Sequence, residues 1–190
     1  MSGITEDLDG AGNVLLAAPS MGGSREVCTS LLTDGVEVPS VLFVSFTRGA
    51  AACLDQWDAA GTEAGDLAII TVGDGAGVDR EGVHTETVQT PSDLTGLGIQ
   101  ISQPLAEWDP PIVVCFDSLT SMLQYVDFET AYEFLHAITG QLHAADARAH
   151  FHVDPEAHED RQIEGLTSLF DARVDLTGGD PVVRTREVIE

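Results

Sequence analysis

Short apolar segments recur along the chain and are separated by polar, glycine-rich or amphipathic stretches. Four of these segments are continuously apolar, which is typical of strands that are buried on both faces of a sheet. They are residues 13–18, 41–46, 67–72 and 112–116. Two weaker segments, residues 83–88 and 150–153, are also predicted to be strands.

Helical spacing of apolar residues appears between the predicted strands. The clearest case is residues 127–145, where apolar side chains from Phe128 to Leu142 recur at intervals of three and four. Residues 92–108 are also predicted to be helical, with Ser92 as the cap. The remaining predicted helices are residues 25–32, 50–60 and 159–169.

The alternation of apolar strands with helices predicts an α/β fold, with a mostly parallel central sheet that helices cover on both faces. The last two apolar segments, 172–176 and 182–188, flank the turn sequence TGGDP and predict a C-terminal β-hairpin. Residues 1–12 are polar and acidic, so we expect a flexible acidic lead-in there. A single domain is then expected over residues 13–190.

Acidic residues outnumber basic residues by 32 to 8, which gives a formal net charge of −24. All of the basic residues are arginine, and the acidic residues are spread along the chain. In molar salt the screening length falls to about 3 Å, so such a surface repels itself little. We therefore expect a halophilic protein with an acidic surface, which argues against nucleic-acid binding.

No apolar segment approaches the roughly 20 residues of a membrane-spanning helix. The N-terminal sequence MSGITEDLDG lacks both the basic start and the apolar stretch of a signal peptide. These two observations predict a cytoplasmic protein that does not associate with membranes.

Three cysteines, Cys28, Cys53 and Cys115, lie in apolar surroundings without a CxxC spacing, so buried free thiols are expected. His150 and His152 are two residues apart and would share one face of a strand. The sequence contains no HExxH motif and shows no cysteine partner for them. No metal site is therefore predicted from the histidines.

The turn after the first strand lies where a phosphate-binding loop would lie. Such a loop has the pattern GxxxxGK[ST] between a strand and a helix, because backbone N–H groups and a lysine surround the phosphates. Gly23 stands at the second glycine position, Ser24 at the lysine position and Arg25 at the hydroxyl position. The candidate vestigial nucleotide-binding residues here are Ala18, Pro19, Ser20, Met21, Gly22, Gly23, Ser24 and Arg25. The alternative is an ordinary glycine-containing turn between a strand and a helix.

An acidic residue, Asp117, follows the fourth buried strand, and Ser118 comes directly after it. An acid at this place is the form of a Walker B motif, in which it helps to hold magnesium. Asp117 and Ser118 therefore join the candidate nucleotide site, with Asp117 as the candidate magnesium ligand. The alternative is that Asp117 caps a helix that begins near Ser118.

The C-terminal half of the chain resembles KaiC-like members of the RecA superfamily. The order of its motifs carries the resemblance: Asp117-Ser118-Leu119, Tyr125, Asp127, Asp154-Pro155, His158 and Leu169-Phe170-Asp171. More narrowly, the segments DLTGLGI and FDSLTSMLQYVD are similar to those of a haloarchaeal group of short KaiC relatives. The resemblance extends more loosely over residues 13–190, and it implies a RecA-like three-layer sandwich.

Departures from the family pattern decide the expected function. KaiC-like enzymes place glutamates after the second strand to activate water, whereas this chain has Thr47 and Arg48. Because the loop lysine and hydroxyl are replaced too, the resemblance implies no catalytic residue and only weak binding of ATP and Mg²⁺. We expect a pseudo-ATPase that acts as a regulatory or adaptor module, through protein partners or self-association. The alternatives are a divergent ATPase that uses Arg25 and Asp117, and a structural oligomer subunit.

Overall fold

A computed structural model describes residues 2–8 and 10–186 of the 190-residue chain. Within this part of the chain, eight strands form one sheet in the order β4-β3-β2-β5-β6-β1-β7-β8. Neighbouring strands are parallel except for β7 and β8, which form an antiparallel hairpin. The predicted fold class, an α/β fold with a mostly parallel sheet and a C-terminal hairpin, is confirmed.

The strands are β1 (Asn13–Ala17), β2 (Ser40–Ser45), β3 (Leu67–Val72), β4 (Val83–Val88), β5 (Ile112–Asp117), β6 (Ala147–Val153), β7 (Ala172–Asp175) and β8 (Val182–Thr185). The helices are α1 (Ser2–Asp7), α2 (Ser24–Thr33), α3 (Ala50–Ala60), α4 (Leu94–Glu107), α5 (Leu119–Met122), α6 (Phe128–Ala144) and α7 (Asp160–Thr167), with a 3-10 turn, η1 (Pro155–Ala157). Helices connect most of the consecutive parallel strands, as a crossover between parallel strands requires.

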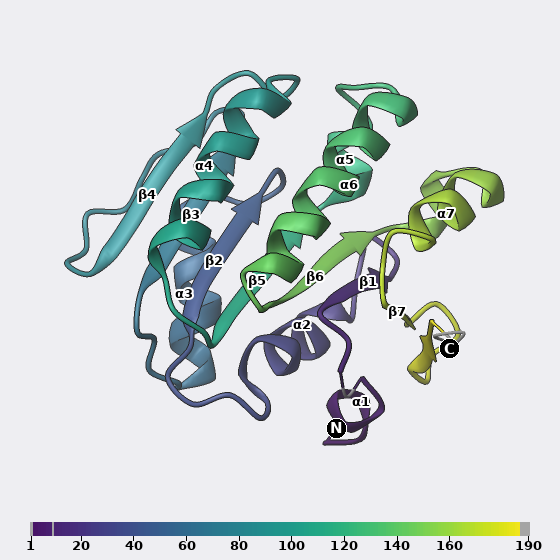
Figure 1. The fold of residues 1–190 in the computed structure, drawn as a ribbon, viewed down its shortest axis with the longest axis horizontal. Coiled ribbons are helices and arrows are strands. Elements are labelled where there is room, and N and C mark those ends of the chain that lie inside the picture. The colour runs from purple at the N-terminus through teal and green to yellow at the C-terminus, as the bar shows by residue number, and fades with distance from the viewer. Residues whose placement is uncertain (1, 9, 187–190) are drawn as a thin grey trace.

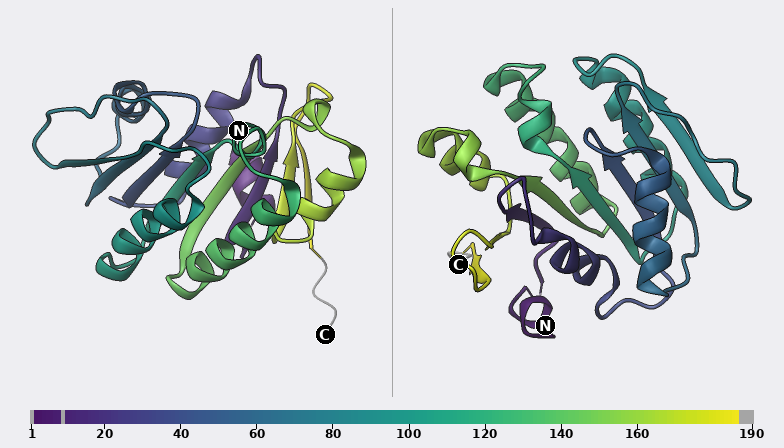
Figure 2. Two further views of the ribbon diagram at one scale, coloured as in Figure 1. Left: turned by 90° about the horizontal axis from the view of Figure 1, so that it is seen from above. Right: turned by 180° about the vertical axis from the view of Figure 1, so that it is seen from behind.

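Helices cover both faces of the sheet, so the molecule has three layers (Figures 1 and 2). Helices α4, α5, α6 and α7 pack on one face, which we call the α4/α6 face. Helices α1, α2 and α3 pack on the other, which we call the α2/α3 face. Each face has its own hydrophobic cluster, because successive side chains of a strand point to opposite sides of the sheet.

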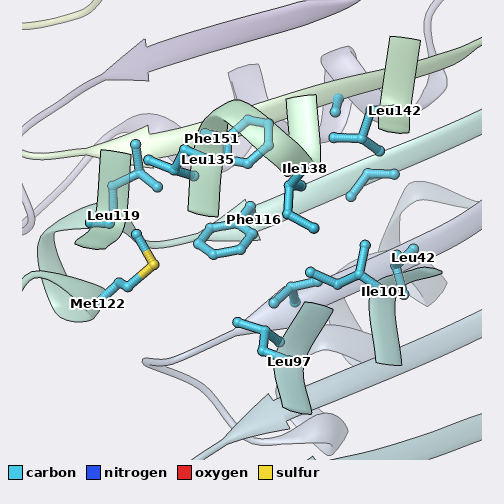
Figure 3. Packing of buried hydrophobic residues seen from close by; sticks show 14 of the residues in the cluster. Leu42, Leu97, Ile101, Phe116, Leu119, Met122, Leu135, Ile138, Leu142 and Phe151 are labelled. Carbon is cyan, nitrogen blue, oxygen red and sulfur yellow. The ribbon is translucent and has the colours of Figure 1, made fainter. Parts of the chain in front are cut away.

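The cluster of the α4/α6 face is built around aromatic rings (Figure 3). Phe116 of β5 stacks on Phe151 of β6 with ring centroids 5.1 Å apart, and Phe151 also contacts Phe170 at 5.1 Å. Leu135 and Leu142 of α6 are fully buried in the same cluster. Burying each of these large side chains contributes roughly 1.5–3 kcal/mol to folding, so this face is a main source of stability.

The N-terminal segment differs from the prediction. The sequence suggests a flexible acidic lead-in, whereas the structure has helix α1 at Ser2–Asp7. Two apolar residues explain the difference, since Ile4 and Leu8 are buried in the cluster of the α2/α3 face. The acidic residues between them remain on the outer side of the segment, so the mean polarity of the segment conceals its apolar contacts.

Helix α4 and strand β6 differ from the prediction in their starts. The cap of α4 is Asp93 rather than Ser92, because the Asp93 carboxylate accepts a hydrogen bond of 2.9 Å from the Gly96 backbone N–H. Strand β6 begins at Ala147, three residues before the predicted start, and pairs with β5 from there.

Residues 187 and 188 of the predicted hairpin lie outside the described residues. In the described part of the chain, no helix is long and apolar enough to cross a membrane.

The carboxyl ends of four parallel strands meet at one edge of the sheet. Ser45 at the end of β2 is in register with Asp117 at the end of β5. Ala17 at the end of β1 is in register with Val153 at the end of β6. The loops that follow these strands therefore lie side by side at the edge where α/β sheets commonly bind ligands.

Candidate functional site

A cleft of about 660 Å³ lies at this carboxyl edge, between the loop after β1 and the ends of β2, β5 and β6. Nine of the ten residues predicted for a vestigial nucleotide site line it: Ala18, Pro19, Ser20, Gly22, Gly23, Ser24, Arg25, Asp117 and Ser118. The tenth, Met21, is 96% exposed and does not line the cleft. The structure therefore brings together the loop and the Asp117 strand that the sequence suggested as halves of one site.

The loop after β1 enters α2 through two glycines with positive φ. Gly22 has a φ of 144°, and Gly23, the N-cap of α2, has a φ of 76°. A residue with a Cβ would be strained at either position. Gly23 offers no side chain to cap the first backbone N–H groups of α2, and Ser24 and Arg25 beside them line the cleft. The uncapped start of α2 therefore lies at the cleft, which is the place that the sequence predicted for a phosphate-binding loop.

A carboxylate at the end of β6 holds this loop in place. Asp154 Oδ2 accepts hydrogen bonds from the Ser20 backbone N–H at 2.9 Å and from the Ser20 hydroxyl at 2.7 Å. Its other oxygen accepts a hydrogen bond from the Glu156 N–H at 3.0 Å. Burial raises the pKa of Asp154, but the hydrogen bonds from Ser20 outweigh it, and the pKa lies below its ordinary value.

Asp117 points into the cleft and is already paired. Its Oδ2 accepts a hydrogen bond of 3.0 Å from the Thr47 hydroxyl and lies 3.5 Å from Arg48 Nε. The cap of α5 is Ser118, whose Oγ accepts a hydrogen bond from the Ser121 N–H at 3.1 Å. The alternative that Asp117 caps this helix is therefore wrong. Thr47 and Arg48, which stand where KaiC-like enzymes have glutamates, contact the candidate magnesium ligand directly.

A chain of polar contacts leads from Asp117 through α3 to α2. Arg48 Nη1 donates a hydrogen bond of 2.7 Å to Gln56 Oε1 of α3. Gln56 Nε2 in turn donates to Thr29 Oγ1 at 3.2 Å and contacts Cys28 Sγ at 3.4 Å. The side chain of Arg48 is thereby held from both ends, by Asp117 and by α3.

Four side chains beneath the cleft form a compact group, which we call the cysteine–histidine cluster: Cys28 of α2, Cys115 of β5, and His150 and His152 of β6. Cys28 Sγ lies 3.0 Å from His150 Nε2 and 3.6 Å from Cys115 Sγ, and Cys115 Sγ lies 3.5 Å from His152 Nε2. Cys28, Cys115 and His150 are buried. The expectation that the histidines have no cysteine partner is wrong, because the partners come from different elements. Cys28 and His152 also line the cleft.

The thiols and imidazoles of the cluster shift one another's pKa values. The hydrogen bond with Cys115 holds the pKa of Cys28 well below its ordinary value, against the effect of burial and with support from the histidines. The hydrogen bond with Cys28, together with burial, raises the pKa of Cys115. Burial lowers the pKa of His152, but the negative charge of Cys28 outweighs it, so the pKa is raised. Cys28 and His152 therefore shift one another's pKa values in the directions that favour their charged forms.

The remaining family-like motifs have structural partners. Asp171 Oδ2 accepts hydrogen bonds from the backbone N–H groups of Gly12 and Asn13, at 3.1 and 2.9 Å, and so fixes the start of β1. Thr120 Oγ1 lies 3.0 Å from His158 Nε2 and accepts a hydrogen bond from the Asp154 N–H at 2.8 Å. The Asp171 contacts lie at the amino end of β1, whereas Thr120 and Asp154 line the cleft at the carboxyl edge.

Sequence reasoning missed Cys28, Gln56 and His152 as residues of the cleft. One signal was present in the sequence, since Cys28 follows Ser24 by four residues and so lies one helical turn below the loop. Gln56 had no such signal, because its position depends on how α3 packs beside α2. All three cysteines are free and buried, as predicted.

The chain is thus an α/β protein with a cleft at the carboxyl edge of a mostly parallel sheet, the edge where such sheets commonly bind ligands. The chain belongs to a family described as "Family of unknown function (DUF7504)", whose model matches residues 11–176. Its fold is similar to that of a solved Pyrococcus horikoshii OT3 protein, project PH0250, with a TM-score of 0.64 and 12% sequence identity. That match covers 97% of this chain and 91% of the other, and at this identity it shows the fold alone. No curated protein matches the chain.

Proposed function

We propose that this chain is a non-catalytic, KaiC-like module of the RecA superfamily, which regulates or links other proteins and does not hydrolyse ATP. The observation that carries the proposal is the pairing of Asp117 with Arg48 and Thr47. Phosphoryl transfer in P-loop enzymes requires a cation on the phosphates, a held magnesium ion and a positioned water. Here a positive guanidinium lies beside the carboxylate that would hold the magnesium.

Charge in the cleft supports the same conclusion. Two arginines, Arg25 and Arg48, and two aspartates, Asp117 and Asp154, line the cleft. A site for a nucleoside triphosphate needs an excess of positive charge or a bound metal ion. The charges of these two arginines and two aspartates cancel, and Asp117, the candidate metal ligand, is paired with Arg48. The volume of about 660 Å³ is within the roughly 300–1,000 Å³ typical of small-molecule sites, so a weakly held nucleotide would fit.

The alternative function is that of a divergent ATPase, which would use Arg25 and Asp117. Arg25 lies at the start of α2, where an anion would be favoured, and this position is the observation in its favour. The two proposals differ in a single measurable quantity, the steady-state rate of ATP hydrolysis. A structural oligomer subunit is separated from both by its mass in solution as a function of concentration.

ATP hydrolysis should be measured in molar KCl with Mg²⁺, because the net charge of −24 calls for screening. We expect no turnover by the purified protein above the rate of a protein-free control. Asp117→Ala should behave like the parent chain, and so should Glu63→Ala, a matched change of an exposed acid outside the cleft. Turnover that Asp117→Ala abolishes and Glu63→Ala preserves would establish the divergent ATPase instead.

A further inference from the structure

Strand β6 is unusual for a strand inside a covered sheet. It lies between β1 and β5, and helices cover both faces of the sheet. Its apolar residues all belong to the cluster of the α4/α6 face, while the alternate positions, Arg148, His150 and His152, belong to the other side. Polar side chains in such a place need strong partners, because burying them without partners is costly.

The partners of the two histidines are thiols, and the four ligand atoms converge on one point. They all lie within 4.8 Å of one another. Tetrahedral zinc, with Zn–S of about 2.3 Å and Zn–N of about 2.0–2.1 Å, separates two sulfurs by about 3.8 Å and a sulfur from a nitrogen by about 3.6 Å. The corresponding distances here are 3.6 Å between the sulfurs, and 3.0 and 3.5 Å between sulfur and Nε2. These three distances are close to those of a zinc site, and no two of the four ligand atoms are more than 4.8 Å apart.

We propose that Cys28, Cys115, His150 and His152 bind one Zn²⁺ ion. Binding would release the thiol protons to solvent, and two thiolates would neutralise the two charges of the ion. A neutral complex of this kind is compatible with a site in which three of the four ligands are buried. Because four protein ligands complete the tetrahedron, the site is structural and leaves no position for a substrate.

Two other uses of these cysteines account for less of the geometry. A disulfide between Cys28 and Cys115 would need an oxidant and would leave both imidazoles without their sulfur partners. A Cys28–His150 nucleophile would need an open approach to the sulfur, whereas both side chains are at most 2% exposed. Neither use gives a role to all four side chains, and zinc does.

The surroundings suit a bound ion. Gln56 Nε2, 3.4 Å from Cys28 Sγ, is placed to donate a hydrogen bond to the thiolate, as groups around zinc sites commonly do. Cys28 and His152 line the cleft, which provides a path for the ion to enter. The ion would join α2, the helix that follows β1, to β5 and β6. Zinc would then fix the geometry of this edge without any nucleotide.

The test is to load the reduced full-length chain with Zn²⁺ in molar KCl and dialyse it against a weak chelator, which removes zinc from exposed carboxylates. We expect one zinc per chain, and X-ray absorption should show two sulfur and two nitrogen ligands at about 2.3 and 2.0–2.1 Å. Cys115→Ala and His152→Gln should each weaken zinc binding by more than about 100-fold, beyond the usual effect of a residue in the surrounding shell. Cys53→Ala, which alters a buried cysteine outside the cluster, should retain the full stoichiometry.

Absorption spectra of the Co²⁺-substituted protein provide a second measurement, which does not depend on the folding of the variants. A thiolate-to-cobalt band and the intense visible bands of tetrahedral cobalt are expected. The proposal is overturned by a first shell of oxygen ligands, by zinc that dialysis removes, or by stoichiometry that survives in folded Cys115→Ala. A Cys28–Cys115 disulfide in protein purified under reducing conditions would overturn it as well.

Discussion

The two faces of the sheet are built from the same strands but have different interiors. On the α4/α6 face, β6 contributes Phe151 and its apolar neighbours to a core of stacked rings and leucines (Figure 3). On the α2/α3 face, the same strand contributes His150 and His152 to a group with Cys28 and Cys115. Apolar side chains are sufficient for a face whose role is to form the hydrophobic core. Polar side chains that are buried under a layer of helices indicate a functional or metal-binding site.

The α4/α6 face should respond most strongly to the loss of a side chain. Phe151 is fully buried and contacts two other rings, so Phe151→Ala should lower the free energy of unfolding by about 3–5 kcal/mol. Denaturant unfolding in molar KCl measures this loss. On the other face, Cys53→Ala removes only one sulfur atom and should cost about 1 kcal/mol. Equal losses at the two positions would contradict the packing of Phe151 against the other two rings.

The pairing at the rim of the α2/α3 face should have an intermediate effect. Arg48→Met removes the partner of Asp117 and the hydrogen bond to Gln56, so we expect a loss of about 1–2 kcal/mol in the free energy of unfolding. Arg80→Met is the control, because Arg80 pairs with Asp58 at 2.7 Å on an exposed surface, where such pairs contribute little. Equal losses of unfolding free energy in Arg48→Met and Arg80→Met would show that the Arg48–Asp117 contact stabilises the fold no more than an exposed ion pair does.

The contact between the loop after β1 and Asp154 at the end of β6 should have the smallest effect, and it should depend on pH. Ser20→Ala removes a hydrogen bond to Asp154, and in this exposed setting we expect a loss of about 0.5 kcal/mol at pH 7. Because the pKa of Asp154 is lowered in the folded state, the stabilisation is present above the unfolded pKa of about 3.9. It is lost as the pH falls through the folded pKa.

The difference in unfolding free energy between the parent chain and Ser20→Ala should therefore be constant from neutral pH down to about pH 5, and shrink in more acidic solution. Unfolding curves of both proteins at each pH provide this difference directly, and other titrating groups cancel in it. A difference that grows as the pH falls would contradict the assigned role of Asp154.

Much of the fold was predictable from the sequence, because buried parallel strands appear as continuous apolar segments. Strand β3 at Leu67–Val72 and helix α3 at Ala50–Ala60 match the predicted ranges. The start of the chain was not predictable in this way, because α1 lies in an acidic segment and its described buried side chains, Ile4 and the adjoining Leu8, are few and far apart. Two separated apolar residues do not change the strongly polar average of such a segment, so a hydrophobicity pattern does not predict their burial.

The candidate site was predictable in part. The loop follows β1 and Asp117 ends β5, and parallel strands of one sheet have their carboxyl ends at the same edge. Their closeness also needs the strand order, in which only β6 separates β5 from β1. The pairing of Arg48 with Asp117 needs the register of β2 on β5, which no local pattern contains. The cysteine–histidine cluster needs still more, because Cys28 and His150 are 122 residues apart in the chain. The spacing of His150 and His152 predicted that they share one face of a strand, but it did not indicate which side chains pack against that face.

The central claim is that Asp117 is committed to Arg48 and does not hold magnesium. The most direct test is the affinity of a fluorescent ATP analogue in molar KCl, measured with Mg²⁺ and with EDTA. We expect weak binding, with the same dissociation constant in Mg²⁺ and in EDTA, and an unchanged dissociation constant in Asp117→Asn. A tightening of about tenfold or more by Mg²⁺, equivalent to about 1.4 kcal/mol, that disappears in Asp117→Asn would contradict it.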